Sequence, residues 1–121
     1  MILILTNNPD AAEAALAPTE LVKGTPLDVL TRARELIDQG YFLVTAPLAA
    51  NNRLNRSPYR SVILSREKSW SGDDAALLDM GISHMALQGF SAAKDADSDY
   101  RWMDLSHLKT ALEESAALGE R

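Results

Sequence analysis

The chain has 121 residues, of which 46% are hydrophobic and 24% charged, and its net charge is −5 at neutral pH. This length and composition predict one globular domain over residues 1–121, with a core large enough to fold without disulfides or a structural metal. The sequence contains no cysteine, which excludes thiolate catalysis and thiolate metal sites. The acidic balance argues against nucleic acid as a partner.

The N-terminal run "MILIL" predicts a first strand over residues 1–5. A continuous apolar run of this kind is typical of a strand that is covered on both faces, as in a parallel sheet. It is too short, and lacks the basic leader, for a signal peptide. No apolar run approaches the roughly 18 residues of a membrane span. We therefore expect a cytoplasmic protein that does not associate with membranes.

Two helices and a short strand are predicted next. In "TNNPD", Asn8 is a helix cap and Pro9 suits the first helical position, so a short helix follows and ends before Pro18. Residues 19–24 form a weakly patterned second strand. The segment 25–40 has the clearest helical pattern, with a Thr25 cap, a C-terminal Gly40 and an apolar stripe at helical spacing. That stripe consists of Leu27, Leu30, Ala33, Leu36 and Ile37.

The second half of the chain predicts two more strands and two more helices. "YFLVTAPL" (residues 41–48) and "SVILS" (residues 61–65) read as the third and fourth strands. A helix over residues 73–90 follows, and Gly81 is expected to weaken or break it. A polar surface loop is expected over residues 91–100. An amphipathic helix, with Leu105, Leu108, Leu112 and Ala116 on one face, completes the chain.

Alternating strands and helices predict the fold class. The expected architecture is α/β: a small, mostly parallel four-stranded sheet with helices on both faces, as in a Rossmann-like three-layer sandwich. In such sheets, ligands bind beyond the carboxyl ends of the strands. The polar residues after the first strand and those after the third strand are then expected at one edge.

That edge is the candidate binding site. Arginine presents a rigid fork of donors that matches carboxylate or phosphate oxygens, and asparagine supplies orienting donors and acceptors. The predicted ligand is therefore a small anionic metabolite. The proposed ligand-binding residues are Asn7, Asn8, Thr45, Asn51, Asn52, Arg53, Arg56, Tyr59 and Arg60. The alternative is that these arginines are solvated and the asparagines merely serve turns.

No established catalytic or cofactor motif accompanies these residues. The glycine-rich phosphate loops and the Gly-x-Ser-x-Gly elbow are missing, and His84 and His107 lack metal-site spacing. We therefore expect no catalytic residue, no metal and no cofactor. Asp73 and Asp74 read as helix caps. Residues 95–99 read as a solvated acidic loop rather than a calcium loop.

Two segments, "ILTNNP" and "LDVLTRARELIDQGYFLVTAPLAANNRLNRSPYRSVILS", and the overall length resemble those of the GrdX-like proteins. These small proteins are encoded beside the glycine, sarcosine and betaine reductase genes of anaerobic bacteria. The resemblance implies an accessory or regulatory role in amino-acid reductive metabolism, with a reductase complex component as a partner. The family has no established activity, so the resemblance assigns no catalytic residue.

Three functions remain open from the sequence. The first is a ligand-binding accessory or regulatory protein that holds a small anion at the strand ends. The second is a protein–protein assembly module without a small-molecule site, which the amphipathic last helix would suit. The third is an enzyme in which Tyr59 donates a proton, although a tyrosine pKa near ~10 makes that residue a poor acid or base. A homodimer is compatible with all three.

Overall fold

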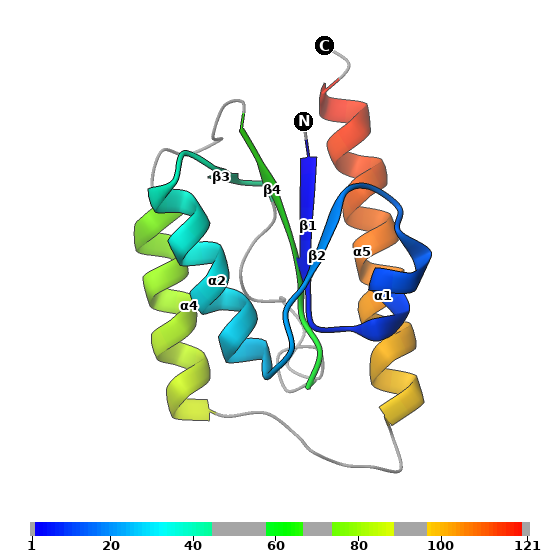
Figure 1. Cartoon of the computed structure of the whole chain (residues 1–121), viewed down its shortest axis with the longest axis horizontal. Helices are drawn as coiled ribbons and strands as arrows, with labels where there is room; N and C mark the ends of the chain where they lie inside the picture. The colour runs from blue at the N-terminus through cyan, green and yellow to red at the C-terminus, as the bar shows by residue number, and fades with distance from the viewer. Residues whose placement is uncertain (1, 45–57, 67–73, 89–96, 120–121) are drawn as a thin grey trace.

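The computed structural model of the chain describes residues 2–44, 58–66, 74–88 and 97–119. Its strands are β1 (Ile2–Thr6), β2 (Thr19–Leu21), β3 (Phe42–Leu43) and β4 (Ser61–Ser65). Its helices are α1 (Pro9–Ala14), α2 (Pro26–Asp38), α4 (Asp74–Gln88) and α5 (Asp97–Gly119). The sheet lies between α2 and α4 on one side and α1 and α5 on the other (Figure 1).

The sheet is mixed, which corrects the expectation of a mostly parallel, Rossmann-like sheet. Its strand order is β2-β1-β4-β3. Only β1 and β2 pair in parallel, whereas β4 runs antiparallel to both β1 and β3. Both central strands are apolar because helices cover both faces of the sheet. The apolar runs therefore indicate that both faces of these strands are buried, but they do not indicate the direction of the strands.

Strand alternation divides the core into two layers. Leu5, Val62 and Leu64 face α2 and α4, where they pack with Leu30 and Leu78. On the other face, Ile4 and Ile63 pack with Ala11 of α1 and Leu108 of α5. Successive side chains of a strand point to opposite faces, so Thr6 and Ser61 lie in the same row as Ile4 and Ile63. They are also register partners, and this row therefore ends in two hydroxyl groups.

Helix α2 begins and ends where its sequence signals indicate. The Thr25 side chain accepts from the backbone N–H of Asp28, and the Asp28 carboxylate accepts from the backbone N–H of Thr25, which completes a capping box. At the other end, Gly40 has φ of 101°, a left-handed conformation that favours glycine. The predicted helix over residues 25–40 is confirmed.

Helix α4 continues through Gly81 without a break, contrary to expectation. Its buried residues are Asp74, Leu78, Gly81 and Met85, at spacings of four, three and four. These residues share one face of the helix, and α4 packs on α2. Gly81 therefore lies on the buried face of α4 and does not end the helix.

The last helix begins earlier than the sequence predicted. Helix α5 starts at Asp97, so Asp97 and Tyr100 are helical and not part of the expected polar loop. Leu108 is buried and Leu105 and Leu112 pack partly against the same layer, as expected for the amphipathic face. The earlier start adds a first turn to α5, and Asp97 in this turn accepts a hydrogen bond from Tyr59, just before β4.

Candidate functional site

A buried polar cluster occupies the point where β1 ends and β4 begins. Thr6 and Asn8 are fully buried, and Asn7, Arg60 and Asp104 are each 7% exposed. They come from three parts of the chain: the turn after β1, the entry to β4 and the first half of α5. Ser61 belongs to the same group through its hydrogen bonds. We call these six residues the rim cluster.

Asn7 fastens three segments of backbone together. Its Nδ2 donates to the carbonyl oxygens of Gly24 at 3.0 Å and Pro58 at 2.9 Å. Its Oδ1 accepts from the backbone N–H of Arg60 at 2.8 Å. Both amide hydrogens of Asn7 are used in these contacts. The residue therefore joins the end of β1 to the segment before α2 and to the entry of β4.

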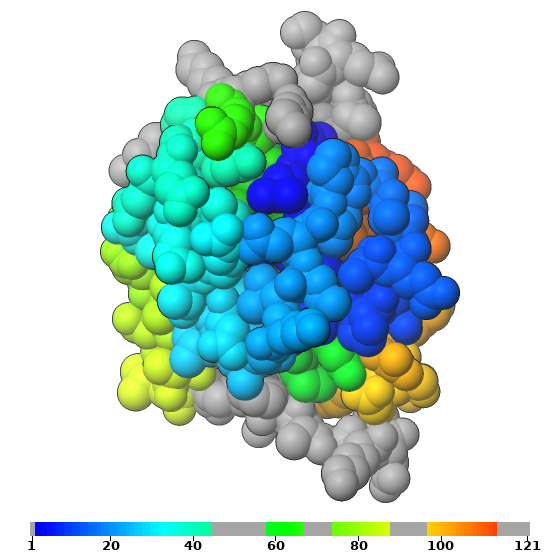
Figure 2. Space-filling model, in the orientation of Figure 1, coloured from blue at the N-terminus to red at the C-terminus, as the bar shows by residue number. Residues whose placement is uncertain are grey.

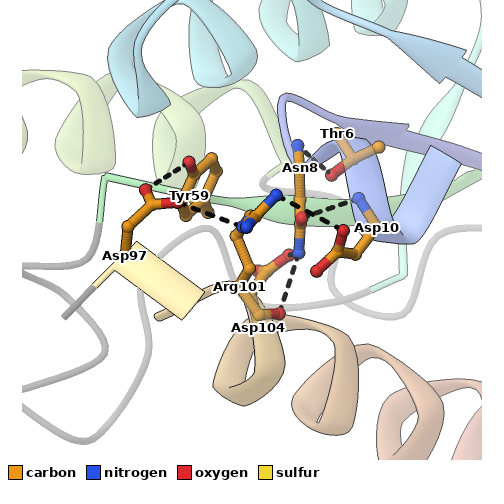
Figure 3. Close-up of polar contacts among 7 residues, drawn as sticks. All are labelled: Thr6, Asn8, Asp10, Tyr59, Asp97, Arg101 and Asp104. Carbon is orange, nitrogen blue, oxygen red and sulfur yellow. Dashed lines mark hydrogen bonds and ion pairs between the residues drawn. The ribbon is translucent and has the colours of Figure 1, made fainter. Parts of the chain in front are cut away.

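Asn8 caps one helix and contacts another (Figure 3). Its Oδ1 accepts from the backbone N–H of Asp10, which caps α1 as the sequence predicted. Its Nδ2 donates to the carbonyl oxygen of Arg101 and to Oδ2 of Asp104, both at 3.0 Å. One amide group thus satisfies the start of α1 and holds α5 against the sheet.

A directed chain of hydroxyl groups ends on Asp104. The backbone N–H of Asn8 donates to Thr6 Oγ1 at 3.0 Å, and Thr6 Oγ1 lies 2.7 Å from Ser61 Oγ. Ser61 Oγ donates to Asp104 Oδ2 at 2.6 Å. Because Ser61 has a single hydroxyl hydrogen, Thr6 must be the donor between the two hydroxyls. Asp104 Oδ2 therefore accepts from both Ser61 and Asn8.

Burial disfavours the charged forms of the two ionisable residues of the rim cluster, Asp104 and Arg60. Burial raises the pKa of Asp104, and the hydrogen bonds from Ser61 and Asn8 and the positive charge of Arg60 offset only part of this effect. Burial also lowers the pKa of Arg60, and the negative charge of Asp104 again offsets only part of the change. Opposite charges placed at this depth are costly, and such groups concentrate at functional sites.

Tyr59 lies in a second, more exposed set of contacts beside the cluster (Figure 3). Its hydroxyl donates to Asp97 Oδ1 at 2.6 Å. Arg101 connects two acids, with Nε 3.2 Å from Asp97 Oδ2 and one terminal nitrogen 3.5 Å from Asp10 Oδ1. The Nε contact is an ion pair without the alignment of a hydrogen bond. Burial, followed by the contact with Asp97, raises the pKa of Tyr59, so the phenol stays protonated at neutral pH.

The structure thus brings together four of the nine predicted ligand-binding residues: Asn7, Asn8, Tyr59 and Arg60. The other five, Thr45, Asn51, Asn52, Arg53 and Arg56, lie outside the described residues. The first and third strands run in the same direction, as expected, since both are antiparallel to β4. However, β4 lies between them.

Asp104 and Arg101 were missed by sequence reasoning. The last helix was expected to start at residue 103, so Arg101 lay outside it, and Asp104, although within it, was assigned no contact. A signal was present, because Asp97, Arg101, Asp104 and Leu108 are spaced by four, three and four, which places them on the face that carries buried Leu108. A charged residue at such an inward position predicts a buried polar contact.

In the described part of the chain, no group of three or more histidine or acidic side chains is arranged to hold a metal ion. Among the described helices, none has the length and apolarity needed to cross a membrane.

We expect the titration of Asp104 to stabilise the folded protein as the pH falls, which is opposite to the usual effect of acid on a paired carboxylate. Its folded-state pKa is raised above the ordinary value of 3.8, so its stabilising contribution is fully present below that value and is lost as pH rises through the raised pKa. Lowering the pH through this window should therefore stabilise the wild type relative to Asp104→Asn. Urea unfolding of both proteins across the window measures the difference, and a difference that stays constant with pH contradicts the assignment.

The fold and the cluster together define a small three-layer α/β protein that has a mixed sheet and a buried polar cluster at the end of its first strand. The family model of the GrdX-like proteins matches residues 3–113, and the chain belongs to this family. This confirms the resemblance seen in the sequence. No curated protein and no solved structure shows a significant match to the chain.

Proposed function

We propose that this protein binds a small anionic metabolite at the rim cluster and acts as a cytoplasmic accessory or regulatory protein of glycine, sarcosine or betaine reductase metabolism. Membership of the GrdX-like family supports the metabolic setting. The observation that carries the ligand class is the position of Arg60, a buried guanidinium at the entry to β4 whose backbone is fixed by Asn7. A bound anion would add negative charge beside this guanidinium and stabilise its charged form.

The asparagines act as positioning residues in this proposal. Asn7 and Asn8 use all four of their amide hydrogens within the protein, so neither has a hydrogen left to donate to a ligand. Asn7 fixes the backbone of Arg60 and of Pro58, just before β4. Arg53 and Arg56 precede this anchored point by five and two residues, and the proposal assigns them, with Arg60, to ligand contact.

A binding role fits the geometry better than catalysis by Tyr59. A phenol whose pKa is raised is a weaker acid than an ordinary tyrosine at neutral pH, and its hydrogen is already donated to Asp97. General acid–base catalysis works best when the pKa lies near the working pH. The residue therefore serves to hold the start of α5 beside the entry to β4.

A ligand screen followed by titration tests the proposal. Phosphate, acetyl phosphate, glycine, betaine and nucleotides are compared for their effect on the melting temperature. A ligand present at 100 times its dissociation constant stabilises by about 2.7 kcal/mol, on the order of 10 °C for a domain of this size. We expect at least one anion, and not its neutral analogue, to produce such a shift.

Matched arginine variants assign the effect to the site. Arg53→Ala and Arg56→Ala should weaken binding of the active anion at least tenfold, and Arg60→Lys should weaken it while the buried charge is kept. Arg34→Ala is the control, because Arg34 lies on α2, where it pairs with Asp38 and Asp79. If no anion shifts the melting temperature, or if the control weakens binding as much as the site variants, the proposal fails.

A further inference from the structure

Asp104 accepts hydrogen bonds through only one of its two carboxyl oxygens. Its Oδ2 accepts from Ser61 Oγ at 2.6 Å and from Asn8 Nδ2 at 3.0 Å. No described residue donates to Oδ1, and this oxygen is not fully enclosed by the protein. A proton can therefore bind at Oδ1 without breaking either hydrogen bond to Oδ2. The carboxyl group thus has two charge states that keep the same contacts.

The buried positive charge that acts on Asp104 is that of Arg60, at the entry to β4. Ser61, which donates to Asp104, directly follows Arg60 in the chain. Figure 2 shows the segment that leads into β4, in green at the lower edge, on the surface between the starts of α2 and α5. An anion from solvent can therefore reach the end of the sheet where Arg60 and Asp104 both lie.

Other charged groups near Asp104 affect it less. His107, one turn further along α5, also favours the ionised carboxyl, but less than Arg60 does, and its side chain is exposed, where salt screens its charge. Arg101, one turn earlier on the same helix, is already paired with two acids, Asp97 and Asp10 of α1. The charge state of Asp104 therefore depends mainly on its burial and on Arg60.

We propose that Asp104 takes up one proton when an anion binds beside Arg60, so that anion binding is coupled to pH. This inference rests on the anion site of the proposed function and adds a second ligand, the proton, to that site. The anion places a negative charge near a buried carboxylate, and like charges repel strongly in a medium of low dielectric constant. Protonation at Oδ1 removes this repulsion and leaves the hydrogen bonds from Asn8 and Ser61 in place.

The coupling fixes the direction of the pH dependence. A bound anion raises the pKa of Asp104, and a proton on Asp104 raises the affinity for the anion by the same factor. Below the pKa of Asp104 in the free protein, the carboxyl is already neutral and the affinity is highest. As the pH rises, the affinity falls by at most about tenfold per pH unit, until the pKa of the complex is passed. Because burial raises the pKa of Asp104 in the free protein above 3.8, this window lies nearer to neutrality than for an exposed aspartate.

Sulfate tests the coupling, because its own charge stays constant across the window. Its dissociation constant is measured by calorimetry from about pH 5 to about pH 8, in buffers with different ionisation enthalpies, which also report proton uptake. We expect the wild type to bind sulfate about tenfold more tightly at the acidic end and to take up as much as one proton. The affinity of Asp104→Asn for sulfate should no longer depend on pH.

Two control variants separate Asp104 from other groups that titrate. His107→Gln removes the histidine that lies one turn away, and Asp79→Asn removes an exposed acid on α4 that pairs with Arg34. Both should keep the pH dependence of the wild type. If His107→Gln loses the dependence, or if Asp104→Asn keeps it, the proposal is overturned.

A titration without ligand distinguishes failure of this inference from failure of the proposed function. NMR follows the carboxyl carbon of Asp104 in the wild type and in Arg60→Gln, in which loss of the positive charge should raise the titration midpoint. An unchanged midpoint, or a sulfate affinity that is equal at every pH, overturns the coupling but leaves the anion site in place. A raised midpoint without sulfate binding at any pH overturns the anion site, and this inference falls with it.

Discussion

Asn8→Asp is expected to destabilise the protein by about 3–5 kcal/mol at neutral pH, although the two side chains have nearly the same shape. Aspartate caps helices as well as asparagine does, so the start of α1 is preserved. The new carboxylate, however, would replace the amide that now donates to Asp104 and to the carbonyl oxygen of Arg101. Two like charges would then face each other in a buried site.

The pair is tested by a double-mutant cycle in urea. Asp104→Asn in the Asn8→Asp background exchanges the amide and the carboxylate, restores a donor–acceptor contact and should recover at least half of the lost free energy. Lowering the pH should also recover part of the single variant's loss, since one carboxylate then becomes protonated. Asn8→Ser, which keeps the cap but shortens the side chain, separates the capping effect from the contact with Asp104. If the two substitutions are simply additive, the two positions do not interact.

Asn7→Ala should cost about 3 kcal/mol, because three backbone groups lose their partner at once. The groups are the carbonyl oxygens of Gly24 and Pro58 and the N–H of Arg60, and they belong to segments far apart in the sequence. We expect the melting temperature to fall by on the order of 10 °C and the amide hydrogen of Arg60 to exchange faster with solvent.

Thr31→Ala is the matched control for this prediction. The Thr31 hydroxyl also donates to a backbone carbonyl, that of Leu27, but the contact is exposed and lies within one helix. Its loss should change stability by less than about 0.5 kcal/mol. If Asn7→Ala costs no more than this control, Asn7 does not hold the three segments together.

Elements with strong local signals were predictable from the sequence. The run "SVILS" forms β4 over the expected residues, and Thr25 and Gly40 lie at the two ends of α2 as expected. Asn8 caps α1 and Pro9 begins it. In each case the signal is local: a cap, a fixed proline φ or a run of apolar residues decides the conformation of its own neighbourhood.

Strand direction and the partners of the site were not predictable in this way. The central strands are apolar on both faces whether they run parallel or antiparallel, so "MILIL" and "SVILS" contain no information about their relative direction. Asp104 lies 96 residues after Asn8, and nothing near either residue identifies the other as its partner. Gly81 was misread for a similar reason, because its place on the buried face of α4 depends on the tertiary packing of that helix.

The contacts of Asn8 also affect when, during synthesis of the chain, the fold can form. The amide of Asn8, in the turn that follows the first strand, bonds to groups 93 and 96 residues later in the chain. Contacts of such long sequence separation slow folding, because a long loop must close before they form. The turn after β1 therefore gains these neighbours only after α5 has been synthesised, and a product truncated before Asp97 would leave Ile4 and Ile63 without α5 to cover them.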